Sequence, residues 1–362
     1  SVVLRSVQEI RDSGLKVDEP IRAVDLQAVV TYHDPLWGLL FVEDEYGGIY
    51  VDPDDTSLNR IPGGSVVRIR GTKQRGVTSN LITEADIEFL RSGEKVTPVK
   101  SSIEQMNTGS MDSNFITIEA IIQRAQKRDH ALELKLISRD GKVKAYIRGY
   151  SGAEPFDHLI DSKVELTGTC GFEFSPDMEI LGTLIYLNDQ DQMKILQDGR
   201  TSFEQAPIDR LSKLDFSNSG EEVASRILLK GHYMGDANQN NFYFQTEYQG
   251  FIVHPVQTDA SVEFGQEIEV LGWPRLQDYS FEIVDAVLRR HVAIAVLDNL
   301  AQSGMLLDSS NLNRFVRRSG FLTRFERHDE RMTLHIDSSG QHLIANLEFH
   351  DNDMERDYEI PV

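Results

Sequence analysis

The chain has 362 residues, 40% hydrophobic and 26% charged, which is typical of a folded protein with more than one hydrophobic core. Its 37 basic and 58 acidic residues give a formal net charge of −21, which repels phosphate backbones, so nucleic acid is not expected as a partner. The single cysteine, Cys170, excludes an internal disulfide framework and a zinc site built from several thiolates.

The first predicted module covers residues 1–97 and begins with a short helical lead-in. From Leu26 onward, β-rich runs alternate with a polar loop, a turn at Gly47 and Gly48, and a later Pro-Gly-Gly turn. A further strand follows in SVVRIRG, where apolar and polar residues alternate as in a strand with one buried face. This order of strands and turns predicts a small β-module.

The same order returns along the chain, which indicates an internal repeat. We expect a second copy in residues 98–205 and a third in residues 206–292, each with a glycine turn between its second and third strands. A fourth copy, in residues 293–362, has no counterpart of SVVRIRG and is predicted to be partial, leading towards a membrane segment. Short Ile, Leu and Met patterns between the copies predict one or two helical turns.

The strand content of each copy indicates its fold. Four to five short strands with a glycine turn suit a small Greek-key barrel, because closure of the barrel removes unpaired sheet edges. We therefore predict an all-β protein of tandem OB-like Greek-key barrels joined by short helical linkers. A β-sandwich has similar strand content and stays as the structural alternative.

The loop between the first two strands of the first module is the best candidate for a binding site. OB folds commonly place ligand contacts there, and this loop combines a titratable ring with a large aromatic side chain. We predict Tyr32, His33, Asp34 and Trp37 as ligand-binding residues. The alternative interpretation is structural: the proline and glycine of the loop build the turn, and Trp37 covers the end of the barrel.

Motifs of catalysis are absent from the sequence. It has no nucleophile elbow, zincin helix, phosphate-binding loop or dinucleotide fingerprint. Cys170 has no activating motif around it and is interpreted as a buried structural thiol. The acidic runs at 52–55 and 350–353 lack the spacing of a calcium loop and are interpreted as solvated surface. We expect no catalytic residue, no metal ligand and no cofactor.

The pattern VVTYHDPLWGLLFVEDEYGGIYVD, followed by PGGSVVRIRG, resembles the N-terminal sensor region of bacterial membrane-bound two-component sensor histidine kinases with tandem OB-like repeats. The resemblance covers nearly the whole chain and is most specific between Thr31 and Ile49. It implies a non-catalytic region on the periplasmic or extracellular side of a bacterial inner membrane. A transmembrane helix and a dimeric kinase core would follow this region in the parent protein.

Two features of the chain agree with a fragment of such a receptor. The chain begins at Ser1 without a basic and apolar leader, so we expect any signal peptide to have been removed or left out. Its longest apolar runs, such as 292–297, are far shorter than the roughly 20 residues that cross a bilayer. If the parent spans a membrane, we expect that span outside this chain.

The sequence therefore predicts a receptor region that recognises a small-molecule or protein signal, with dimerisation left open. Two other functions are kept as alternatives. One is an OB-fold array that binds nucleic acid, since its aromatic side chains could stack on bases. The other is an accessory β-region of a secreted hydrolase.

Overall fold

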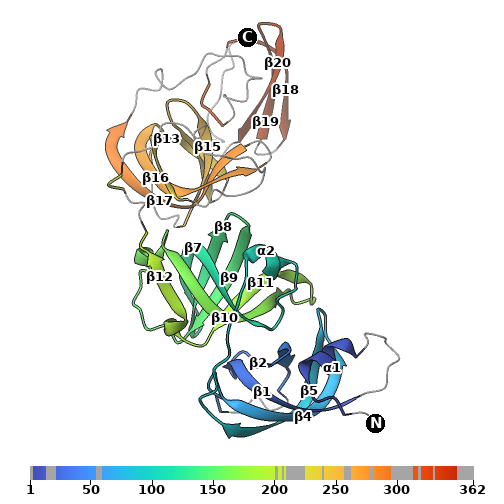
Figure 1. Cartoon of the computed structure of the whole chain (residues 1–362). Coiled ribbons are helices and arrows are strands. Elements are labelled where there is room, and N and C mark those ends of the chain that lie inside the picture. Colours follow the sequence, from blue (N-terminus) through green and yellow to red (C-terminus); the bar gives the residue numbers. More distant parts are fainter. Residues whose placement is uncertain are drawn as a thin grey trace.

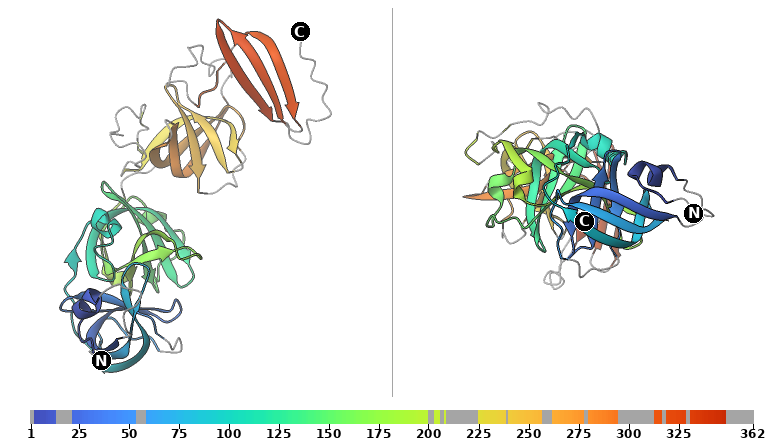
Figure 2. Two further views of the ribbon diagram at one scale, coloured as in Figure 1. Left: turned by 90° about the vertical axis from the view of Figure 1, so that its right-hand side faces the viewer. Right: turned by 60° about the horizontal axis from the view of Figure 1, so that its bottom comes forward.

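A computed structural model describes residues 3–13, 22–53, 59–199, 203–205, 208, 225–238, 240–256, 262–277, 280–294, 313–316, 319–328 and 331–348. Within these ranges the chain is nearly all β, in four sheets that follow one another in sequence order. Figures 1 and 2 show the four sheets in a row, from the first barrel in blue to the last sheet in red. This arrangement confirms the predicted all-β fold of tandem OB-like barrels.

The first barrel is closed by five strands in the order β1-β2-β3-β5-β4. All its strand pairs are antiparallel except β3 with β5, as in a Greek-key OB fold. A short helix, α1 (Val7–Asp12), precedes the barrel, and Ser6 caps it by accepting a hydrogen bond from the backbone N–H of Glu9. The strands are β1 (Ala23–Asp34), β2 (Leu39–Asp44), β3 (Gly47–Val51), β4 (Val66–Arg75) and β5 (Asn80–Arg91).

The second barrel repeats this order and adds a strand on each side. The pairing of β10 with β7 closes the ring, while β6 and β12 extend the sheet. A capping box of Ser102 and Gln105 begins α2 (Ile103–Asn107), which confirms the helical turn predicted between the first two modules. The strands are β6 (Val99–Lys100), β7 (Phe115–Arg128), β8 (Ala131–Ser138), β9 (Gly141–Arg148), β10 (Lys163–Phe174), β11 (Ile180–Leu187) and β12 (Met193–Gln197).

The third barrel has the strand order of the first, and a separate three-stranded sheet follows it. The third barrel contains β13 (Ile227–Asn238), β14 (Asn241–Gln245), β15 (Gly250–Pro255), β16 (Gln266–Gln277) and β17 (Ser280–Ile294). The last sheet contains β18 (Phe321–His328), β19 (Arg331–Ser338) and β20 (Gln341–Glu348). Each sheet lies within one expected module, except that β17 runs two residues past 292. The module boundaries themselves stay predictions.

In each complete copy the SVVRIRG-like segment ends in a glycine, and the structure shows the same reason for it in each barrel. Gly71, Gly168 and Gly272 lie where the fourth strand of each barrel crosses close to the fifth. A Cβ atom on Gly71 would lie 2.7 Å from the carbonyl oxygen of Thr83, and one on Gly168 would lie 2.4 Å from that of Tyr186. The repeat keeps a glycine there because the two backbones leave no room for a side chain.

Each barrel has its own hydrophobic core, and the barrels also contact one another. At the second junction, the fully buried Trp273 of β16 packs with Ile137 of β8 and Val284 of β17. The other two segments for which helical turns were predicted lie almost wholly outside the described residues. Of the helices that are described, none is long and apolar enough to cross a membrane.

Candidate ligand-binding site between the first two barrels

A cavity of about 850 Å³ lies between the first and second barrels. The first barrel contributes its β1–β2 turn, one face of β2 and β3, and its β4–β5 turn. The second barrel closes the cavity with three parts: the last residues of β9, the strand β11 and the β10–β11 turn. Its apolar wall consists mainly of Trp37, Leu39, Phe41, Tyr50, Val77, Leu81, Tyr146, Phe172, Phe174, Met178, Leu184 and Tyr186.

The position of the cavity on the first barrel matches the general binding surface of OB folds. In that fold, the face of strands two and three and the loops between strands one and two and four and five bind oligonucleotides and oligosaccharides. Here Trp37 lies in the β1–β2 turn, Phe41 and Tyr50 lie on β2 and β3, and residues 74–79 form the β4–β5 turn. All three elements of that surface therefore face one cavity.

The aromatic wall is held in place by ring-to-ring contacts. Tyr186 stacks on Tyr32 with a centroid distance of 5.0 Å, and Phe41 contacts Tyr50 at 5.3 Å. Trp37 lies edge-on to Tyr146 of the second barrel at 5.3 Å. Packed rings of this kind lose little entropy on binding and offer flat apolar faces to a sugar ring or a planar heterocycle.

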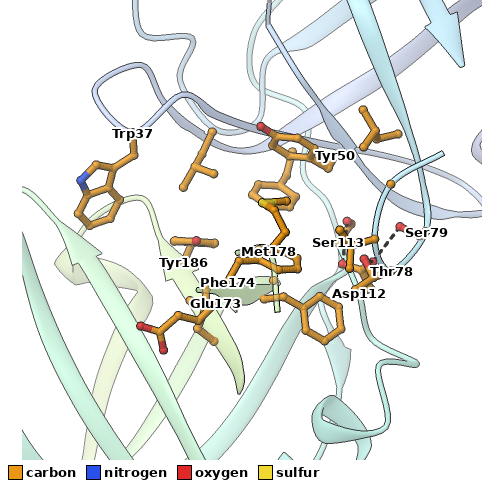
Figure 3. A pocket seen from close by; sticks show the side chains of 18 of the residues that line it. Trp37, Tyr50, Thr78, Ser79, Asp112, Ser113, Glu173, Phe174, Met178 and Tyr186 are labelled. Carbon is orange, nitrogen blue, oxygen red and sulfur yellow. Dashed lines mark hydrogen bonds between the residues drawn. The ribbon is translucent and has the colours of Figure 1, made fainter. Parts of the chain in front are cut away.

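Polar groups lie at both ends of the cavity. Figure 3 shows Trp37 on one side and Thr78, Ser79 and Asp112 on the other, with Met178 and Phe174 between them. The hydroxyls of Thr78 and Ser79 donate to the same oxygen of Asp112, at 3.0 and 2.9 Å. Trp37 and Tyr186, which also line the cavity, each have one side-chain hydrogen-bond donor.

These two donors, the indole N–H of Trp37 and the hydroxyl of Tyr186, have no hydrogen-bond partner in the described part of the chain. The hydroxyl of Tyr50 is engaged, because it donates to the carbonyl of Gly38 at 3.1 Å. Burial and the charge of Asp52 raise the pKa of Tyr50 to about 12. Tyr50 therefore stays protonated and anchors the β1–β2 turn at the rim of the cavity.

Of the four predicted site residues, only Trp37 lines the cavity. Tyr32, His33 and Asp34 are buried, with exposures of 0%, 1% and 0%, because the second barrel and the 59–61 segment cover them. Their partners in this structure are protein groups: Nδ1 of His33 accepts the backbone N–H of Ile61 at 2.8 Å. Direct ligand contact by these three residues stays a prediction.

Asp34 joins the first barrel to the second. Its Oδ2 lies 2.5 Å from Nε2 of His130 and 3.3 Å from Nε of Arg148, and the hydroxyl of Tyr32 donates to it at 3.3 Å. Burial would raise the pKa of Asp34, but the hydrogen bond and charge of His130, with the charge of Arg148, hold it below its usual value. The carboxylate is therefore ionised and ties two elements of the second barrel to the cavity-lining turn.

The turn at Gly47 and Gly48 lies against the segment that links the first two barrels. The N–H of Gly48 donates to Oδ1 of Asn114 at 2.9 Å, and a Cβ on Gly48 would lie 1.8 Å from the carbonyl oxygen of Ser113. Arg11 donates to the carbonyls of both Gly48 and Asp112, at 2.6 and 3.0 Å. This close approach explains why the first copy has a second glycine where the later copies have side chains.

The sequence alone missed most of the cavity wall. The general OB rule, applied to every loop, would have included Phe41, Tyr50 and the 74–79 turn. Phe174 and Tyr186 belong to the second barrel and reach the site only through docking of the two barrels. No local pattern in the sequence indicates such a contact.

Cys170 is buried, as interpreted from the sequence, and burial raises the pKa of its thiol to about 12. Within the described residues, no group of three His, Cys, Asp or Glu side chains is arranged to hold a metal ion. The acidic run at 350–353 and residues 54–55 of the other run lie outside those residues.

Neither a protein-family model nor a curated protein sequence matches the chain. Among similar solved structures is a murine DNA-binding protein bound to double-stranded DNA, with 8% identity and a TM-score of 0.25, covering 49% of this chain and 99% of that one. Another is the Ifi202 HINa domain in complex with 20 bp double-stranded DNA, with 10% identity and a TM-score of 0.25, covering 49% and 100%. The p202 HIN1 domain with a 12-mer of double-stranded DNA has 10% identity and a TM-score of 0.24, covering 52% and 98%.

This comparison corrects one expectation from the sequence. Nucleic acid was excluded as a partner on the net charge of −21, yet the similar structures include domains bound to double-stranded DNA. The exclusion was wrong because a net charge is a sum over the whole chain, whereas a ligand meets only the charges of one local surface. The net charge of the chain therefore gives no ground for excluding nucleic acid.

Proposed function

We propose that this chain is the extracytoplasmic sensing region of a bacterial signal-transduction receptor of the sensor histidine kinase type, and that its signal binds in the cavity between the first two barrels. The observation that carries the proposal is the cavity itself, where the whole OB binding surface of the first barrel faces the second barrel. The resemblance of the first module to sensor regions supports the receptor assignment. Its placement outside the cytoplasm and its lack of catalysis are part of the same proposal.

The place of the cavity suits a sensor because a ligand there contacts two barrels at once. A ligand shifts an equilibrium between two arrangements only as far as it binds one of them more tightly. Trp37 and Tyr50 come from one barrel and Phe174 and Tyr186 from the other, so a ligand held between them favours one barrel orientation. That orientation is the signal that would pass along the row of barrels.

The chemistry of the wall limits the class of signal. A volume of about 850 Å³ is within the range of ordinary small-molecule sites, of about 300 to 1,000 Å³. Flat aromatic faces with hydroxyl and carboxylate groups at one end suit a small organic molecule that has both an apolar ring face and hydrogen-bonding groups. Sugars and aromatic metabolites meet both conditions.

The test is a thermal-shift screen of the chain against sugars, aromatic metabolites and peptides. A ligand that binds only the folded state raises the melting temperature. Once the ligand concentration exceeds Kd, this shift grows with the logarithm of the ratio of concentration to Kd. Because Phe174 is 37% exposed, Phe174→Ala removes a cavity ring at little structural cost, and Trp37→Ala removes a ring from the opposite wall. Tyr46→Ala is the matched control, since Tyr46 is 53% exposed on the same barrel and does not line the cavity.

We expect a compound that shifts the wild type and Tyr46→Ala, with the shift reduced in both cavity variants. Loss of a stacking ring costs about 1 kcal/mol or more, which lowers affinity by roughly fivefold to tenfold. A ligand whose shift is the same in all four proteins binds elsewhere and would contradict the assignment of the cavity.

Binding of single-stranded nucleic acid is the second candidate, favoured by the aromatic rings that line the cavity on the OB surface. Bases stack on such rings with little sequence preference, and this binding weakens steeply with salt. A fluorescently labelled oligonucleotide titrated at two salt concentrations separates the candidates. Salt-sensitive binding that Trp37→Ala and Phe174→Ala weaken, and Tyr46→Ala does not, would favour nucleic acid over a neutral small molecule.

A further inference from the structure

A second cavity, of about 710 Å³, lies at the junction of the second and third barrels and has the opposite charge to the rest of the chain. It has no Phe, Tyr or Trp in its wall, and it is lined by residues of β7, β8, β9, β10, β11 and α2 together with segments of the third barrel. Two carboxylates, Glu173 and Asp285, line it. Five cationic side chains line it as well: Arg124, Lys135, Lys142, Lys144 and Arg275.

Three of these cations form a row across adjacent strands. Arg124 of β7 is directly opposite Lys135 of β8, and Lys135 is directly opposite Lys144 of β9. Side chains opposite one another in a sheet lie about 5 Å apart, and like charges in such pairs destabilise the sheet. A row of three cations therefore needs negative charge from outside these strands.

The two ends of the row have such a counter-charge. Arg124 lies 3.4 Å from Oδ1 of Asp285 in the third barrel, and Lys144 donates to both oxygens of Glu173, at 2.8 and 2.6 Å. The central Lys135 has no ion-pair or hydrogen-bond partner among the residues that the structure describes. The middle of the row therefore carries an uncompensated charge at the wall of a cavity.

We propose that this junction cavity binds the phosphoryl group of an anionic ligand, with Lys135 as its central contact. A phosphoryl group has several oxygens and at least one full negative charge, so it can contact Lys135 and a neighbouring cation together. Hydrogen bonds between charged groups are about twice as strong as neutral ones, and a guanidinium such as that of Arg124 binds such oxygens in pairs. Arg275 and His254 of the third barrel line the same cavity, where Arg275 is paired with Glu282, so a ligand held by Lys135 would lie against both the second and third barrels.

The first test is an isothermal titration of the chain with pyrophosphate, at an ionic strength held constant with chloride. Lys135→Gln keeps most of the side-chain length and removes the charge, and we expect it to weaken binding about tenfold. Lys194→Gln is the control, because Lys194 lies on β12 of the same barrel, is 70% exposed and does not line the cavity. No binding of pyrophosphate, or equal binding by both variants, would overturn the proposal.

A second measurement needs no ligand. If Lys135 is repelled by its two neighbours, Lys135→Gln should melt at the same temperature as the wild type or higher in anion-free buffer. A clear drop in melting temperature would mean that Lys135 already has a stabilising partner, and the premise would be wrong.

The source of the phosphoryl group is decided by a competition experiment with a labelled single-stranded oligonucleotide. If the oligonucleotide binds, pyrophosphate displaces it and Lys135→Gln weakens its binding, the phosphoryl group belongs to a nucleic-acid backbone. If pyrophosphate binds with the same dependence on Lys135 and the oligonucleotide does not compete, the group belongs to a small phosphorylated molecule.

Discussion

At the scale of single residues, Asp34 determines how the first two barrels are joined. Its buried carboxylate is contacted by His130, Arg148 and the hydroxyl of Tyr32. The side chains of His130 and Arg148 are about one fifth to one quarter exposed, so solvent screens part of the attraction. In this structure the partners of Asp34 are protein groups that hold the cavity wall in place, and its predicted contact with a ligand stays a prediction.

We predict that Asp34→Asn lowers the free energy of unfolding by about 2 to 3 kcal/mol, because it leaves His130 and Arg148 without their partner carboxylate. Chemical denaturation followed by tryptophan fluorescence measures this change, since Trp37 contacts the same His130 ring at 4.7 Å. Asp86→Asn is the control, as Asp86 is 76% exposed and 3.7 Å from Arg70. Equal effects of the two substitutions would mean that the Asp34 contact contributes nothing to stability.

His33 should make the first barrel sensitive to acid. Burial outweighs the opposing charge of Asp34 and, with Arg148 and Arg60, lowers the pKa of His33 from 6.5 to about 4. Its Nδ1 must also stay unprotonated to accept the Ile61 N–H. Between pH 6.5 and about 4 the unfolded chain takes up a proton that the folded chain does not, so stability falls as pH falls. We predict a flatter dependence of melting temperature on pH in His33→Asn than in the wild type over that window. Parallel curves would mean that His33 titrates normally.

At the scale of elements, the strands and turns were predictable because they are encoded locally. Alternation of apolar and polar residues gives the strands, and glycine turns separate them, so β1 to β4 of the first barrel and their counterparts in the later copies followed from the sequence, whereas β5 was not predicted. The cavity was not predictable in the same way. Trp37 was found from its turn, but Phe174 and Tyr186 are some 140 residues away in sequence and are brought to it by barrel docking.

The turn between β2 and β3 shows that the contact between two barrels also restricts which residue fits at a single position. We predict that Gly48→Ala costs about 1 to 3 kcal/mol, because its Cβ would lie 1.8 Å from the backbone oxygen of Ser113 and the linker cannot yield without moving the second barrel. Gly182→Ala is the control, since a Cβ there meets no atom within 4 Å. Denaturation of both variants gives the free energies, and small-angle scattering shows any separation of the barrels. Indistinguishable results for the two would contradict the close approach.

At the scale of the whole molecule, the two junctions between barrels differ in chemistry. The first has an aromatic cavity and the Asp34 ion pairs, while the second has the buried Trp273 beside a row of cations. A net charge of −21 describes neither junction, since charge is distributed unevenly among the surfaces. Sequence composition therefore indicated a folded protein with several cores, but it did not indicate the local charge of either junction.

Glu173 lines both cavities and binds Lys144, so a single ion pair lies between the two sites. Any occupant of the aromatic cavity that draws Glu173 away from Lys144 frees a positive charge in the junction cavity and strengthens anion binding there. Thermodynamic linkage makes this effect reciprocal. If the ligand of the aromatic cavity raises the affinity of the junction cavity for its anion by some factor, the anion raises the affinity of the aromatic cavity by the same factor. The chain would then respond to the coincidence of two ligands rather than to either alone.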